Sequence, residues 1–161
     1  MKSALHPTRP IVAYTSGCMI TVYDLLTDQK FNLIRHDNEV QEVAFAPPGF
    51  GDDYLVSIDF NRNQLGDQSL YGYSKMCIWN WQKAQCIEEV IVPKSQNLSN
   101  MLLQPSLTDS SQQRPRIFQI SFDKVGSTFI VLESSSSDMN GGGYRVTLWN
   151  MSRQRNIEMI S

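Results

Sequence analysis

Three copies of one six-residue pattern constrain the fold more than any other feature of this chain. The copies are ITVYDL at 20–25, MCIWNW at 76–81 and VTLWNM at 146–151. Because side chains alternate between the two faces of a β-strand, each copy puts an aliphatic residue on one face and an aromatic residue on the other. The aliphatic column is Val22, Ile78 and Leu148, and the aromatic column is Tyr23, Trp79 and Trp149. A strand that is apolar on both faces belongs in a sheet that is covered on both sides.

Further strand patterns surround each copy and divide the chain into three units. The units cover 11–35, 40–92 and 116–160, with three predicted strands in the first and four in each of the others. Short turns rich in polar residues, Gly and Pro separate the strands, which is typical of antiparallel meanders. Residues 1–10 are predicted to be a short polar lead. The sequence therefore predicts one all-β domain of eleven strands over 1–161, without a long amphipathic helix.

The spacing of the three copies distinguishes between all-β folds. Trp79 follows Tyr23 by 56 positions, and Trp149 follows Trp79 by 70. When roughly 12 to 25 residues of loop are removed from each interval, a period near 40 to 45 remains, which is the spacing of four-stranded propeller blades. A β-sandwich does not need the same pattern in the third strand of every unit. The spacing predicts about three four-stranded antiparallel blades of a β-propeller.

Three blades form an incomplete ring, because propellers close with four to eight. We therefore expect the remaining blades of a longer propeller, or a partner that completes the ring. Two loops are the candidate contacts for other proteins: an inserted loop at 93–116 and a loop at 61–74. Their candidate side chains are Leu98, Met101, Leu102, Leu103, Arg114 and Arg116, and Leu70, Tyr71 and Tyr73. The alternative interpretation is that both loops are disordered and bind no partner.

A resemblance to a known family is carried by His36, then Val40, Val43 and Phe45, then Ala46-Pro47-Pro48-Gly49 and Leu55-Val56-Ser57. The pairs Tyr23-Asp24, Trp79-Asn80 and Trp149-Asn150 stand where the WD-repeat family has Trp-Asp. The chain resembles that family over nearly its whole length, except the lead, the 61–74 loop and the 93–116 insertion. The resemblance implies a structural hydrogen-bonded set of His36, Ser57 and Trp79 in the second unit only. Arg35 replaces the glycine that the family has before His36, and the family's acidic residue in the turn before the third strand has no clear counterpart.

Two segments narrow this resemblance. Ile11–Cys18 and Ile78–Lys83 are similar to segments of large cytoskeletal WD-repeat proteins. These are the echinoderm microtubule-associated-like proteins, the cilia- and flagella-associated WD-repeat proteins and the kinase-binding WD-repeat scaffolds. The resemblance implies a non-enzymatic scaffold that holds other proteins in a cytoskeletal, ciliary or centriolar assembly.

Composition and charge argue against several other classes of function. The formal net charge is −2 and there is no long basic run, so we expect neither nucleic acid nor an anionic membrane as a partner. No apolar run reaches the roughly 18 residues of a membrane span, and we expect a cytoplasmic protein. Cys18, Cys77 and Cys86 follow neither a disulfide framework nor a metal-binding spacing. We therefore expect no metal and no cofactor.

Catalysis is the alternative function: an enzyme or enzyme subunit with a site in the central channel of a propeller. Such a site needs acids, histidines or metal ligands on the innermost strands. The predicted innermost strands of the second and third units offer only Glu42 and Asp123. His36 next to Asp37 has the residue types of a general base and its orienting acid, but the WD-repeat resemblance gives His36 a structural role. We expect no catalytic residues.

Overall fold

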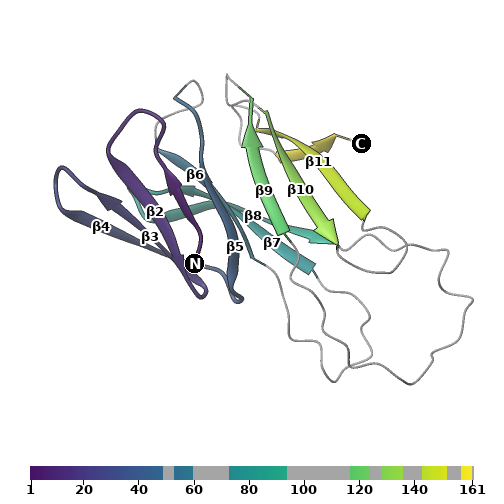
Figure 1. The fold of residues 1–161 in the computed structure, drawn as a ribbon, viewed down its shortest axis with the longest axis horizontal. Coiled ribbons are helices and arrows are strands. Elements are labelled where there is room, and N and C mark those ends of the chain that lie inside the picture. The colour runs from purple at the N-terminus through teal and green to yellow at the C-terminus, as the bar shows by residue number, and fades with distance from the viewer. Residues whose placement is uncertain are drawn as a thin grey trace, which may run out of the picture.

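The computed structural model describes residues 1–48, 53–59, 73–93, 117–123, 128–135, 143–151 and 157–160. Regular structure in this part of the chain is entirely β, with twelve strands in three antiparallel four-stranded sheets (Figure 1). The predicted all-β class is therefore confirmed. Within the same ranges there is no helix with the length and apolar character needed to cross a lipid bilayer.

Each sheet follows the order of the chain, so each is a meander. The first sheet contains β1 (Ser3–Leu5), β2 (Ile11–Ser16), β3 (Met19–Asp24) and β4 (Gln29–Ile34). The second contains β5 (Val40–Phe45), β6 (Tyr54–Asp59), β7 (Tyr73–Asn80) and β8 (Gln85–Pro93). The third contains β9 (Ile117–Phe122), β10 (Thr128–Ser135), β11 (Gly143–Met151) and β12 (Ile157–Ile160). The repeated six-residue pattern lies on β3, β7 and β11, the third strand of each sheet.

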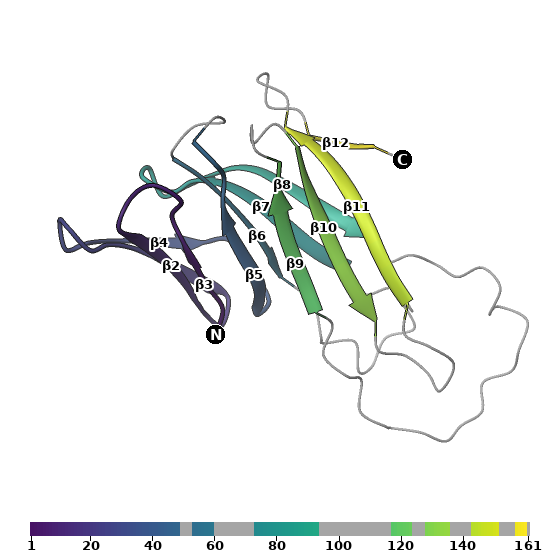
Figure 2. The same cartoon turned by 45° about the horizontal axis from the view of Figure 1, so that its top comes forward.

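The first strands of the three sheets lie against one another. Strand β5 contacts both β1 and β9, while β4, β8 and β12 form the opposite edges of their sheets. Figures 1 and 2 show the result, in which the second sheet lies between the other two.

Two hydrophobic cores fill the spaces between the sheets. The core between the first and second sheets contains Ile11, Ala13, Ile20, Val22, Leu33, Val40, Val43, Phe45, Leu55, Cys77, Trp79 and Trp81. The core between the second and third sheets contains Val56, Ile58, Met76, Ile78, Ile120, Phe129, Val131 and Trp149. The second sheet is therefore covered on both faces, as its strand pattern predicts. The first and third sheets are each covered on one face by the described residues.

The first sheet has one strand more than the sequence predicted. Residues 1–10 were expected to be a polar lead, but β1 pairs with β2 from Ser3↔Tyr14 to Leu5↔Val12. Three residues are too few to show an alternating pattern. The chain then turns back through His6, which is 6% exposed and packs its ring edge-on against Phe45 at 5.0 Å between centroids. A buried contact from another sheet therefore holds β1 in place, and local sequence does not report such a contact.

The observed bounds also adjust the predicted units and loops. The sheets span Ser3–Ile34, Val40–Pro93 and Ile117–Ile160, compared with the predicted 11–35, 40–92 and 116–160. Strand β7 begins at Tyr73, so the predicted loop at 61–74 is two residues too long at its end. Of the inserted loop at 93–116, only Pro93 falls within the described residues.

Candidate functional site

A buried polar set ties the connection between the first two sheets to the second sheet, and Ser57 is at its centre. The hydroxyl oxygen of Ser57 accepts a hydrogen bond from Trp79 Nε1 at 2.8 Å and lies 2.6 Å from His36 Nε2. His36 is in the connection between β4 and β5, Ser57 is on β6 and Trp79 is on β7. All three are between 0 and 4% exposed. The structure thus brings together the three residues that the WD-repeat resemblance selects.

A fourth member, Asp59, was missed by the sequence analysis. Its Oδ2 lies 3.0 Å from His36 Nδ1, both side chains are fully buried, and its Oδ1 accepts a hydrogen bond from the Lys75 amide at 2.9 Å. In the WD-repeat family the acidic residue lies in the turn before the third strand, whereas Asp59 is the last residue of the second strand. One signal was present: Ser57 and Asp59 are two positions apart, so they lie on the same face of β6.

Ser57, His36 and Asp59 have the residue types of a catalytic triad, but their surroundings argue for a structural role. Asp59 Oδ2 lies beside His36 Nδ1, and His36 Nε2 faces the Ser57 hydroxyl, which is the order of groups in such a triad. Ser57 Oγ, however, also accepts from Trp79 and is fully buried. A nucleophile must reach a substrate carbonyl, and this oxygen has no free approach.

A charged cluster next to this set strengthens the same sheet boundary. The Lys75 side chain is only 6% exposed, and its Nζ pairs with the Asp37 carboxylate and donates to the Arg35 carbonyl at 3.1 Å. Arg35 in turn pairs with Glu89 at 2.7 Å. The hydrogen bond from Lys75 is the main reason that the pKa of Asp37 lies below its ordinary value. Burial lowers the pKa of Lys75, but its acidic neighbours outweigh that effect and raise it overall.

The other two members of the aromatic column have different surroundings. Tyr23 lies on the uncovered face of the first sheet, where its hydroxyl donates to Asp28 Oδ1 at 2.6 Å. Trp149 is 4% exposed and stacks on Phe129, with 6.4 Å between centroids. Its Nε1 has no hydrogen-bond partner among the described residues. Val131 is the cause, because it takes the register position on β10 that Ser57 takes on β6.

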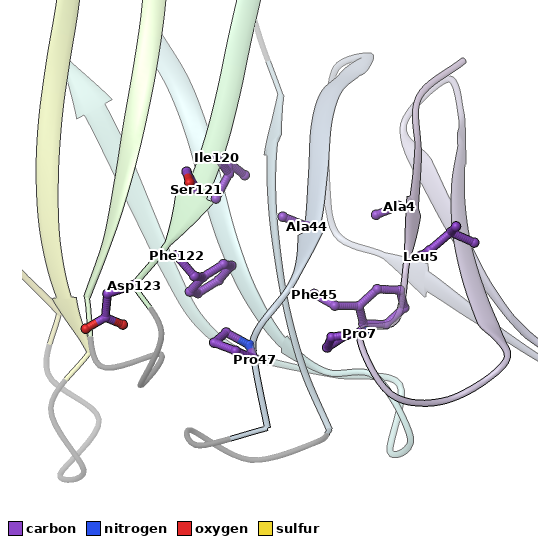
Figure 3. Close-up of a pocket in the computed structure, with 10 residues that line it drawn as sticks. All are labelled: Ala4, Leu5, Pro7, Ala44, Phe45, Pro47, Ile120, Ser121, Phe122 and Asp123. Carbon is purple, nitrogen blue, oxygen red and sulfur yellow. The ribbon is translucent and has the colours of Figure 1, made fainter.

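A groove of about 320 Å³ lies where the first strands meet (Figure 3). Its walls come from β1 and the following turn, β5 and the following turn, and β9. The lining residues are Ala4, Leu5, Pro7, Ala44, Phe45, Pro47, Ile120, Ser121, Phe122 and Asp123. Asp123 is the acid expected from the sequence, but Glu42 does not line the groove. A single carboxylate without a second acid or a base among these residues does not form an acid–base pair.

The remaining predicted residues fall partly outside the described ranges. This applies to Leu98, Met101, Leu102, Leu103, Arg114, Arg116, Leu70 and Tyr71, while Tyr73 is described only as the first backbone position of β7. Cys18, Cys77 and Cys86 are free thiols that are exposed, buried and half-buried, respectively. No group of three or more potential metal ligands occurs within the described residues.

Comparisons with known proteins show similarity at the level of fold. No family model matches the chain, and no curated protein matches it. Among solved structures, the acylaminoacyl peptidase of Pyrococcus horikoshii is similar with a TM-score of 0.54 and 11% sequence identity. The match covers 99% of this chain but only 24% of the peptidase chain. At this identity the similarity concerns the fold alone and carries no information about the reaction.

Proposed function

We propose that the three sheets are neighbouring blades of a WD-repeat β-propeller and that the protein is a non-enzymatic scaffold for protein–protein interaction. The hydrogen-bonded set of His36, Ser57 and Trp79 is the observation that supports this most. It ties the connection before the second sheet to the second and third strands of that sheet, as the WD-repeat resemblance implies. The contacts of β5 with β1 and β9 also support the proposal, because the first strands of propeller blades surround a common axis.

The chemistry of the buried polar groups supports a scaffold over an enzyme. His36 and Asp59 are in contact with each other, and Lys75 is held by acidic side chains at the same boundary. These interactions hold the connection between the first two sheets against the second sheet, and the side chains of His36, Ser57 and Asp59 are buried. A rigid body of this kind presents its connecting loops for binding, since loops can vary without disturbing the core.

The proposed binding surface is formed by the two long connections, 61–74 and 93–116. Residue 93 ends β8 of the second sheet and Ile117 begins β9 of the third, so the longer connection joins neighbouring sheets. The sequence of this connection contains leucines, which are suited to apolar contact, and arginines, which carry charge. We propose partners in a cytoskeletal or ciliary assembly, and a cytoplasmic location, from the resemblance of Ile11–Cys18 and Ile78–Lys83 to such proteins.

The test compares two loop deletions that act as controls for each other. Tagged wild-type protein, a form lacking 94–115 and a form lacking 61–72, each deletion bridged by a short Gly-Ser linker, are captured from ciliated cells with their partners. We expect cytoskeletal or ciliary proteins that are lost from one deletion form and retained by the other. Equal capture by all three forms would exclude both loops as the binding surface. Turnover of ester or peptide substrates by the purified chain would overturn the non-enzymatic assignment.

A further inference from the structure

Two of the three cysteines meet on one face of the second sheet. Cys77 lies on β7 and Cys86 on β8, and Cys86 pairs with Trp79 across the two strands. Because Cys77 and Trp79 are two positions apart on β7, all three side chains lie on the same face. Cys77 belongs to the core between the first and second sheets, and Cys86 packs against that core. A hydrogen bond joins the two thiols, so the β7–β8 hairpin holds two free cysteines in contact.

The ladder between β7 and β8 is irregular at this point. Ile78 pairs with Glu88 and Trp79 pairs with Cys86, so one residue of β8 is left over between the two pairs. Diagonal positions on a regular antiparallel pair are about 7–8 Å apart, whereas disulfide-bonded cysteines have Cα atoms roughly 4.4–6.8 Å apart. A bulge disrupts the ladder locally and bends the bulged strand. A small shift of Cys86 toward its neighbouring thiol is therefore less costly here than in a regular ladder.

The two thiols differ in exposure and in acidity. Cys86 is half-buried, so part of its surface meets solvent, whereas Cys77 is fully buried. The hydrogen bond from Cys77 is the main reason that the pKa of Cys86 is lowered, and the Arg35 guanidinium also contributes. The same hydrogen bond, together with burial, raises the pKa of Cys77. Oxidants react with the accessible thiolate, and sensor cysteines often lie beside a second cysteine that resolves them. These properties make Cys86 the thiol that is oxidised first and Cys77 the resolving thiol.

We propose that Cys77 and Cys86 form a redox-sensitive pair, which hydrogen peroxide converts into a disulfide within the β7–β8 hairpin. In the first step the Cys86 thiolate attacks a peroxide oxygen. The S–O bond forms, the O–O bond breaks and hydroxide leaves, so Cys86 becomes a sulfenic acid. In the second step Cys77 attacks the Cys86 sulfur. The S–S bond forms, the S–O bond breaks, and the hydroxyl group leaves as water with the Cys77 proton. Overall, the two thiols give up two electrons and two protons, and the peroxide is reduced to two molecules of water.

Tryptic peptides report this disulfide directly, because Lys83 lies between the two cysteines. Cys77 falls in the peptide 76–83 and Cys86 in the peptide 84–94. The purified 161-residue chain is treated with hydrogen peroxide, its remaining thiols are blocked with iodoacetamide, and the digest is analysed by mass spectrometry without reduction. We expect the two peptides as one linked species, which dithiothreitol should separate.

Three variants assign the roles of the thiols. Cys86→Ser should abolish the linked species, because the thiol that reacts with peroxide is gone. Cys77→Ala should abolish it too, but oxidation of Cys86 should then stop at the sulfenic acid, which dimedone traps. Cys18→Ser is the matched control, since Cys18 is exposed and lies outside this hairpin, and it should leave the linked species unchanged.

Several results would overturn the pair. One is oxidation of Cys18 while the peptides that contain Cys77 and Cys86 stay separate. Another is a linked species that persists in Cys86→Ser or in Cys77→Ala. A third is a link that forms only between two chains, which a mixture of unlabelled and isotope-labelled protein reveals. Circular dichroism before treatment checks that each variant is folded, and if Cys77→Ala does not fold, the wild type and Cys86→Ser decide the question.

Discussion

Ser57→Ala is the substitution with the clearest predicted effect on this fold. It deletes the one oxygen that lies within hydrogen-bond distance of two buried ring nitrogens, His36 Nε2 at 2.6 Å and Trp79 Nε1 at 2.8 Å. The substitution removes little volume, and water cannot easily replace the oxygen because all three residues are almost fully buried. The change therefore isolates the loss of polar pairing from the loss of packing.

The size of the effect follows from the number of groups that lose their partner. A buried donor or acceptor without a partner costs about 1–3 kcal/mol, and Ser57→Ala creates two such groups. Part of this cost is recovered because alanine has no hydroxyl to desolvate, so we expect the free energy of unfolding to fall by about 2–4 kcal/mol. For a chain of this size, that corresponds to a midpoint temperature lower by roughly 5–15 °C.

Urea and thermal unfolding, followed by circular dichroism, measure this loss. Ser121→Ala is the matched control, since Ser121 is exposed on β9, and we expect a change within about 0.5 kcal/mol. A double-mutant cycle with His36→Ala should give a coupling energy of about 0.5–3 kcal/mol, because the two side chains share one bond. A Ser57→Ala variant as stable as the Ser121→Ala control would show that the set contributes nothing, and the reasoning would fail.

Three further outcomes follow from the described contacts. Burial raises the pKa of Glu42, so its ionised form opposes folding. Glu42→Gln should therefore increase the free energy of unfolding at neutral pH. Urea titrations at several pH values should show that this gain disappears below the ordinary glutamate pKa of about 4.3. A hydrogen bond from the neighbouring buried thiol lowers the pKa of Cys86, so the pH profile of its iodoacetamide labelling, read by mass spectrometry, should have its midpoint below the ordinary cysteine pKa of about 8.5, and a midpoint at or above that value would contradict this. Trp149→Phe should destabilise the protein by about 1–2 kcal/mol less than Trp79→Phe in chemical denaturation, because only Trp79 gives up a hydrogen bond; equal losses would be inconsistent with the unpaired Trp149 nitrogen.

The parts of the fold that could be predicted are those that the chain repeats. One apolar pattern at three positions identifies the third strand of each sheet, and a side chain's place in that pattern decides which neighbouring sheet it faces. Trp79 and Ile78 are adjacent in sequence and belong to different cores, as strand alternation requires. The repeat therefore predicts both the class of the fold and the burial of the second sheet.

The parts that could not be predicted depend on contacts between distant segments. Strand β1 has only three residues, and His6 is held against Phe45 of the second sheet. Asp59 is the last residue of β6, and nothing in its neighbouring sequence indicates a buried partner. Its place is decided by His36, 23 positions earlier, and sequence alone does not show that the two side chains meet.

The boundary between the first and second sheets differs from the boundary between the second and third. The first boundary has both an apolar core and charged or hydrogen-bonded pairs that cross it, among them Arg35 with Glu89. At the second boundary, the described residues contribute an apolar core in which the Trp149 nitrogen is unpaired. If two sheets are misaligned, buried polar groups at their boundary lose their partners, which costs free energy. Apolar side chains can shift past one another at a smaller cost. Among the described residues, the third sheet is therefore joined to the second by apolar contact, which fixes its position less strictly than hydrogen-bonded or charged pairs would.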